Sequence, residues 1–242
     1  MDRDGFEIVR GVITPAEAAA FAEKGLREQD VRTHMAHSDT MWELRTHPRV
    51  LSLFRRLWEC SDIVTGFDGF GVSHGDFVLP WHVDQTCPST SCISIQGILA
   101  LSSHDPRTGG LSLMVGSHRK HSDVLAEMDG DRDREWQYHD VDMDRLHGVT
   151  DTFTPTLSPG DMCVWDSRTI HRVVEGNGSR ARRITAYLSF EPRSQVSEST
   201  ALRRLEALKK GIATTHWASR FVDRGDPHDP PSRITDAMRA IV

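Results

Sequence analysis

Thirteen histidines give this chain many potential metal ligands. Three HxD triplets occur, at residues 37–39, 82–84 and 121–123. Imidazole and carboxylate groups both bind transition metals, and an HxD motif aims them at one point when it lies in a β-strand, because residues i and i+2 share a face. The second triplet ends the strand-like segment 77–84, whereas His37 follows a polar helix-like stretch and His121 lies in a basic loop. We therefore predict that His82 and Asp84 are metal ligands.

A facial triad of two histidines and one carboxylate needs a third ligand from a distant strand, and it leaves open positions on the other side of an iron ion. His171 meets this requirement. It follows the turn 159–161 and the apolar strand-like run 162–165, and it begins another such run, 171–174. The sequence therefore predicts an iron site made by His82, Asp84 and His171.

Two adjacent arginines follow His171 and open the next strand-like run. A guanidinium binds a carboxylate in bidentate fashion, so Arg182 or Arg183 could anchor the distal end of a dicarboxylate. Thr185 would share a face with Arg183. Gln96 lies on the strand after the HxD motif and could hydrogen-bond the same molecule, although a rim or cross-strand role suits it equally well.

The composition is that of an ordinary globular protein. The chain has 242 residues, of which 38% are hydrophobic and 26% charged, and its formal net charge of −6 gives no reason to expect nucleic acid. We find no signal peptide and no run near the roughly 18 apolar residues of a membrane helix. The four cysteines have neither zinc-site spacing nor disulfide density. We expect a cytoplasmic protein with reduced thiols, as a monomer or homodimer.

Short strand-like runs punctuated by turn residues fill the middle of the chain, at 62–73, 77–84, 92–101, 111–115, 161–166, 170–174 and 182–190. This texture predicts a sandwich or jelly roll. A short strand over 5–13 comes first. Helices that begin at a Thr14 capping box and at His47-Pro48 should pack outside the sheet.

Two further segments differ from this pattern. The charged stretch 128–150 is either a solvated insertion or a lid over a pocket. The run from Ser197 to about Lys210 is amphipathic and predicts a helix, and 224–232 is rich in proline and aspartate. We place no catalytic residue in this last part, although a tail can fold back over a site or serve a dimer contact.

Taken in order, these motifs resemble the phytanoyl-CoA dioxygenase family of Fe(II)/2-oxoglutarate oxygenases. The resemblance covers roughly residues 4–191. It rests on Asp4-Gly5-Phe6, Trp81-His82-Val83-Asp84, Gly109-Gly110-Leu111, Gly116-Ser117-His118, Pro159-Gly160-Asp161, His171, Asn177-Gly178-Ser179 and Arg183.

The chain departs from the family pattern at three places. Val115 stands where the family often has proline, and Arg172 where it often has a small residue; neither change touches the ligands. The loop after His171 is one residue longer than usual. Counting from Asn177 and from Phe190 favours Arg183 over Arg182 as the anchor.

The resemblance implies a mainly β protein with a double-stranded β-helix (jelly-roll) core and flanking helices. One domain would span 1–242, with its core at about 4–191 and a helical C-terminal extension at 192–242. Fe(II) would be held by His82, Asp84 and His171. The cosubstrate 2-oxoglutarate would contact Arg183, Thr185 and Gln96.

The implied reaction consumes O2 and 2-oxoglutarate, forms succinate and CO2, and hydroxylates an unactivated C–H bond of a small molecule, in a setting of bacterial specialised metabolism. Related halogenases replace the carboxylate ligand with a small residue that admits chloride. Because Asp84 is retained, we expect hydroxylation or another oxidation and no chlorination.

Two alternatives remain open: a cupin-like metal-binding module without turnover, and a cupin-type metalloenzyme that does not use 2-oxoglutarate. Only the 2-oxoglutarate hypothesis requires the arginine. A basic rim would suit an acidic substrate, but solvated surface charge is the preferred interpretation of the same residues, which are Arg119, Lys120, Arg172, Arg180 and whichever of Arg182 and Arg183 is not buried. We expect Trp81 and Trp165 to be packing residues and His118 to stabilise its own loop.

Overall fold

The computed structural model describes residues 1–85, 93–127, 151–177 and 182–242. The segment 128–150, for which a lid was one interpretation, lies outside these ranges, as do Cys87, Cys92 and Arg180. Cys60 and Cys163, the cysteines within the described ranges, form no disulfide.

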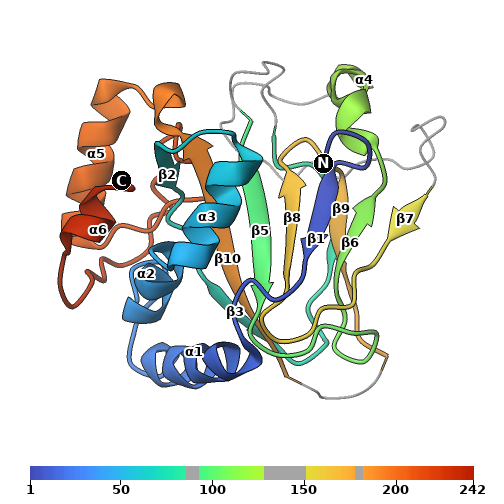
Figure 1. Cartoon of the computed structure of the whole chain (residues 1–242), viewed down its shortest axis with the longest axis horizontal. Helices are drawn as coiled ribbons and strands as arrows, with labels where there is room; N and C mark the ends of the chain where they lie inside the picture. Colours follow the sequence, from blue (N-terminus) through green and yellow to red (C-terminus); the bar gives the residue numbers. More distant parts are fainter. Residues whose placement is uncertain (86–92, 128–150, 178–181) are drawn as a thin grey trace.

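Two antiparallel sheets form the β core, as the jelly-roll prediction requires (Figure 1). The larger sheet has the order β1-β8-β5-β10-β2, with β3 also paired to β10. Its strands are β1 (Phe6–Val9), β2 (Ile63–Thr65), β3 (Phe70–Ser73), β5 (Ile95–Ala100), β8 (Met162–Asp166) and β10 (Arg183–Pro192). The smaller sheet has the order β4-β9-β6-β7. Its strands are β4 (Leu79–His82), β6 (Gly110–Met114), β7 (Thr152–Phe153) and β9 (His171–Val174).

Five helices gather on one side of the larger sheet (Figure 1). They are α1 (Pro15–Gln29), α2 (Asp39–Arg45), α3 (Pro48–Leu57), α5 (Glu198–Lys210) and α6 (Asp236–Arg239). The predicted capping box starts α1, with Thr14 and Glu17 each bonding the other's backbone. A 3₁₀ turn (Ser117–Lys120) and α4 (His121–Glu127) follow β6, and a second 3₁₀ turn (Arg193–Gln195) follows β10. The described helices include none that is long and apolar enough to cross a membrane.

Alternation along the strands separates two apolar clusters. On β10, Ile184, Leu188 and Phe190 join the cluster that packs against the helices, whereas Tyr187 faces the cluster between the two sheets. Side chains two apart on a strand share a face. The face of the larger sheet that carries Tyr187 therefore points toward the smaller sheet, and the space between the two sheets is lined by this face.

The C-terminal extension packs on the same helix-side cluster. Leu208 of α5 and Met238 of α6 are buried in it beside Phe190. The backbone carbonyl of Ile241 accepts a hydrogen bond of 2.9 Å from Thr65 N–H at the edge of the sheet. The predicted helix from Ser197 to about Lys210 is confirmed, with Ser197 as its N-cap.

Several element predictions were wrong. The run 62–73 is two strands, β2 and β3, separated by Gly66 and Gly69. His121 opens α4 and does not lie in a loop. Helix α2 was missed although Ser38 caps it, because the segment is only seven residues long.

Candidate active site

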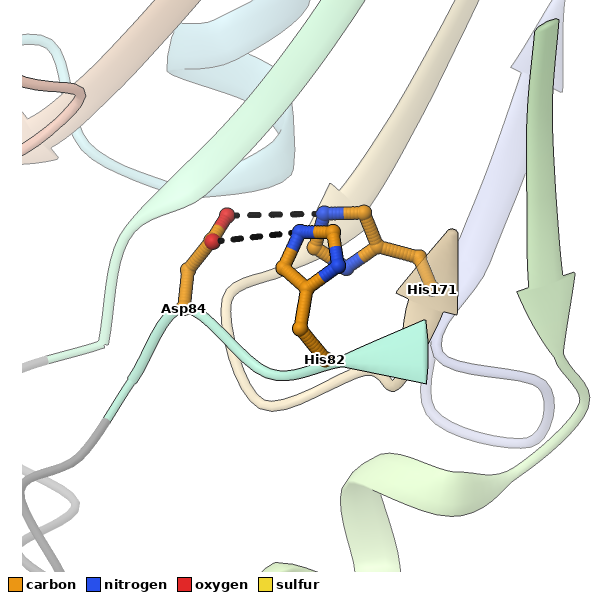
Figure 2. Close-up of side chains that lie close together, drawn as sticks. All are labelled: His82, Asp84 and His171. Atoms are coloured by element: carbon orange, nitrogen blue, oxygen red, sulfur yellow. Dashed lines mark ion pairs between the residues drawn. The ribbon is translucent and has the colours of Figure 1, made fainter. Parts of the chain in front are cut away.

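The three predicted ligands meet at neighbouring strand ends (Figure 2). His82 is the last residue of β4 and His171 the first of β9, and the two are cross-strand partners. Their Nε2 atoms lie 3.6 Å and 3.5 Å from the two carboxylate oxygens of Asp84. Asp84 lies beyond the end of β4, so the expectation that the whole HxD motif occupies a strand was wrong. Its carboxylate nevertheless turns back toward both rings.

Backbone carbonyls orient both imidazoles. His82 Nδ1 lies 2.8 Å from the Pro80 carbonyl oxygen, and His171 Nδ1 lies 2.9 Å from that of Thr169. Because a carbonyl can only accept, each Nδ1 carries the proton and donates it. Each Nε2 therefore keeps its lone pair on the side facing Asp84, which is how a metal-binding histidine is usually held.

The charge states of His171 and Asp84 also suit a cation. Burial lowers the pKa of His171 to about 4, outweighing the opposite effect of the Asp84 carboxylate. Burial pushes the pKa of Asp84 upward, but the positive charges that His171, His216 and His82 can carry outweigh it, and the pKa lies below its usual value. Neutral imidazole and ionised carboxylate are the forms that ligate a metal.

One ion can be reached by all three groups, since a ligand atom of each lies within 4.8 Å of the others. Two metal–ligand bonds of about 2.1 Å at a right angle hold their donor atoms about 3 Å apart, slightly closer than the separations found here. Two imidazoles and one carboxylate are the donor set of the iron(II) facial triad. The residues present therefore fit non-haem iron.

The triad lines a cavity of about 220 Å³ between the two sheets. Arg183 lines the same cavity, is 5% exposed, and forms no ion pair with a carboxylate among the described residues. Burial lowers the pKa of its guanidinium, because the charged form is poorly solvated there. A buried cation without a counter-charge is costly, so this wall of the cavity suits an anionic ligand. Arg182, the alternative anchor, is exposed.

A family model for phytanoyl-CoA dioxygenase (PhyH) matches residues 19–184, more than half of the chain. The chain belongs to this family. Membership confirms the predicted class: a dioxygenase that depends on non-haem iron and 2-oxoglutarate.

Relatives of the chain agree with this assignment. Over 262 residues the chain is 26% identical to Ava biosynthesis cluster protein O of Aspergillus versicolor, covering 91% of this chain and 85% of the relative. It is 27% identical over 165 residues to ectoine dioxygenase of Nocardia farcinica, covering 55% and 54%. The epimerase SnoN, solved with Fe3+, alpha-ketoglutarate and nogalamycin RO, superposes with a TM-score of 0.59 over 78% of this chain and 80% of that chain, at 22% identity.

The structure explains why a glycine stands at position 110 of the Gly109-Gly110 motif. A Cβ on Gly110 would lie 2.9 Å from Arg183 Nη1, and the φ of Gly110 is +143°. The glycine at the start of β6 therefore leaves the space in which the guanidinium lies.

The other two predicted 2-oxoglutarate contacts, Gln96 and Thr185, line different cavities. Gln96 lines the cavity that holds the triad, and its side chain lies near enough to Asp84 to help lower the pKa of that carboxyl. Thr185 does not line that cavity: it borders a neighbouring hollow of about 490 Å³ together with Arg183 and Tyr187. The Thr185 hydroxyl lies 3.2 Å from His104 Nε2.

Sequence reasoning missed four polar residues that line the cavity: Asp68, Tyr187, Ser189 and His216. Alternation along β10, extended past Thr185, could have found Tyr187 and Ser189. No local signal marks His216, which lies in the extension where no functional residue was expected.

The side chains of the basic-rim hypothesis do not border this cavity in the described part of the chain, which favours the alternative of solvated surface charge. Arg119 and Lys120 are exposed and do not line it. The guanidinium of Arg172 lies 4.4 Å from the centre of the Trp81 ring. Trp165 packs between the sheets as predicted and also forms part of the cavity wall. His118 bonds the Asp2 carbonyl, which agrees with a role in holding its loop.

Proposed function

We propose that His82, Asp84 and His171 hold Fe(II), that Arg183 binds the distal carboxylate of 2-oxoglutarate, and that the enzyme hydroxylates a C–H bond of a small molecule. The observation that carries the proposal is the combination, in one cavity, of a facial triad and a buried arginine that has no carboxylate partner among the residues the structure describes. Gln96 and Thr185 remain predicted cosubstrate contacts, and the position of Gln96 in the metal cavity supports it more directly.

Iron loaded with 2-oxoglutarate and O2 supplies the oxidising chemistry, in which the cosubstrate becomes succinate and CO2 and the substrate gains a hydroxyl group. The chain's own residues position the partners. Asp84 and the two histidines take one face of the ion. Arg183 fixes the far end of the cosubstrate, so its keto-acid end is directed toward the metal.

Apolar side chains limit water in the cavity. Leu79, Leu111, Trp165 and Val173 line it beside the polar groups. Phe77 also lines the cavity while 47% exposed, so it lies where the cavity meets solvent. A small molecule with a substantial apolar part suits these walls.

The substrate class is proposed as a small molecule of specialised metabolism. The support comes from similarity to an Ava biosynthesis cluster protein and, in fold, to the epimerase SnoN with nogalamycin RO bound. The contacts of 192–242 with the sheet favour the predicted single domain 1–242. A cytoplasmic location and a monomeric or homodimeric state remain predictions.

The first experiment is anaerobic. Metal-free protein receives Fe(II) and then 2-oxoglutarate, and the visible charge-transfer band of keto-acid chelation to iron is recorded. The band should require both additions and should be lost in Asp84→Ala. Asp123→Ala, at the exposed end of the third HxD triplet, is the matched control and should keep the band. Metal binding without the band would favour the cupin-like alternatives, and no metal binding would refute the proposal.

A second experiment tests a panel of amino acids, acyl thioesters and polyketide-like aromatic compounds to identify the substrate and the type of oxidation. A substrate should stimulate succinate formation, and mass spectrometry of the product should show the addition of one oxygen atom. A product without added oxygen would show that the enzyme catalyses an oxidation other than hydroxylation.

A further inference from the structure

In the C-terminal extension, backbone hydrogen bonds fix residues 214–219 beside the cavity that holds the triad. Glu191, fully buried at the end of β10, accepts hydrogen bonds from the backbone N–H groups of Ala218 (2.6 Å) and Ser219 (2.9 Å). Trp217 is fully buried beside them. Thr214 N–H also bonds the carbonyl of Phe67 at 3.3 Å. His216 lies between these attachments, so its position is set by the fold.

Gly66 allows this segment to approach β10 closely. A Cβ on Gly66 would lie 2.3 Å from Ser189 Oγ and 2.7 Å from the carbonyl oxygen of His216. The Ser189 hydroxyl and the His216 backbone carbonyl therefore lie on either side of a residue that has no side chain. Any larger residue at this position would separate them.

Both residues present unused polar atoms to the cavity. Within the described ranges of the chain, Ser189 Oγ and His216 Nε2 are buried without a hydrogen-bond partner, and both residues line the cavity that holds the triad. A buried polar group without a partner is unfavourable, and Ser189 and His216, unlike most described residues with such an atom, line the cavity. These two atoms suit a ligand that supplies the missing bonds.

The pair lies away from the proposed cosubstrate anchor. Ser189 follows Arg183 by six residues on the same strand, which separates their Cα atoms by about 20 Å at roughly 3.3 Å per residue. A five-carbon dicarboxylate held between Arg183 and iron does not extend to the far end of that strand. Both residues also lie outside the segment 19–184 that the family model matches, which is where a feature of this particular chain is expected.

We propose that His216 and Ser189 together bind a hydroxyl group of the substrate and so orient it beside the metal, a role that rests on the proposed function. A serine hydroxyl donates and accepts, and an imidazole nitrogen does one or the other. A substrate hydroxyl can donate to one of the two residues and accept from the other. The chemical class that this pair selects is an alcohol or phenol, and a methyl ether at the same position would lose one of the two bonds.

The test uses the panel compound that stimulates succinate formation and its methyl ethers at each hydroxyl group. His216→Ala and Ser189→Ala should each raise KM for the hydroxylated compound about tenfold, the effect of one lost hydrogen bond of about 1.4 kcal/mol. They should also remove the preference of the wild type for the hydroxyl over one of the ethers. His216→Gln, which keeps a polar group at similar reach, should retain most of the preference. His228→Ala, exposed in the same extension, is the matched control.

The iron–keto-acid band separates this inference from the proposed function. It should be unchanged in the His216 and Ser189 variants. A weakened band in either variant would assign the pair to the cosubstrate, and an unchanged preference for hydroxyl over ether would remove it from substrate binding; each result overturns the inference alone. A wild type without the band would overturn the proposed function and this inference with it. Should His216→Ala fail to fold by thermal melting, Ser189→Ala and His216→Gln give the same decision.

Discussion

Strand β10 presents two unlike faces. Ile184 and Phe190 point toward the helices and are at most 5% exposed in a wholly apolar cluster. Arg183, Tyr187 and Ser189 point the other way and line the metal cavity. A single strand therefore packs against the helices with one face and lines the candidate site with the other, so substitutions on the two faces should give separable effects.

Phe190→Ala should have the largest effect, lowering the unfolding free energy by about 3–5 kcal/mol through lost burial and a new cavity. Phe190 is fully buried with its ring centroid 4.5 Å from that of Phe54. Urea unfolding measures the loss, and the iron–keto-acid band should persist while the variant is folded. Leu202→Ala, at a position 60% exposed on α5, should change stability by no more than about 0.5 kcal/mol. Loss of the band in folded Phe190→Ala would break the separation between the faces.

Arg183→Ala should weaken 2-oxoglutarate binding about 100-fold, equivalent to about 2.7 kcal/mol, because the distal carboxylate loses its bidentate partner. Metal affinity should be unchanged. The melting temperature should not fall, since the guanidinium has no carboxylate partner in the described structure to lose. Titration of the band with 2-oxoglutarate measures the change. Arg182→Ala is the control, and the opposite result for the two variants would make Arg182 the anchor.

Gly110→Ala should weaken 2-oxoglutarate binding about tenfold, or about 1.4 kcal/mol, because the new Cβ would displace the Arg183 guanidinium from its place 2.9 Å away. The double-mutant cycle is the sharper measurement. In the Arg183→Ala background the same change should leave cosubstrate affinity unaltered. Gly69→Ala, where nothing lies within 4 Å of a new Cβ, controls for an added methyl group. Additive losses would show that Gly110 acts on something other than Arg183.

Glu17→Gln should have the smallest effect and should leave the cavity untouched. Hydrogen bonds from the Thr14 backbone and hydroxyl, with Arg49 nearby, lower the pKa of Glu17 from 4.5 to about 2. A carboxyl whose pKa is depressed on folding stabilises the protein above its unfolded value, near 4.5, and that contribution is lost as the pH falls toward 2. Wild type and variant should therefore differ in unfolding free energy at pH 6 and converge below pH 4.5. Curves that stay parallel would contradict this, and Glu23→Gln on the same helix is the control.

The features that could be predicted from the sequence are those encoded by neighbouring residues and by the order of the motifs along the chain. Strand alternation and turn residues predicted the jelly roll, and the order of motifs singled out Asp84 together with His82 and His171, two of thirteen histidines. Arg183 was favoured over Arg182 by counting, and the two differ in burial as that choice requires.

Long-range contacts account for what was missed. His216 reaches the cavity because Glu191 and Phe67 hold the backbone around it, and no pattern near position 216 encodes those partners. Thr185 shares a strand face with Arg183 as predicted, yet it lines the neighbouring hollow. Alternation predicts the face on which a side chain lies, but it does not predict which of two cavities on that face the side chain borders.

The place of His82 on an edge strand should make the local stability of that edge depend on bound iron. In the described sheet β4 has four residues and one neighbour, β9, and its pairing is interrupted between Leu79 and His82. Iron bound by His82, Asp84 and His171 would join this edge to β9 by coordinate bonds, and binding to the folded state alone stabilises it by mass action. Protein made under iron starvation should exchange the amide hydrogens of residues 79–85 faster and should be cleaved there by proteases. Metal supply would then set how long the enzyme survives in addition to whether it works.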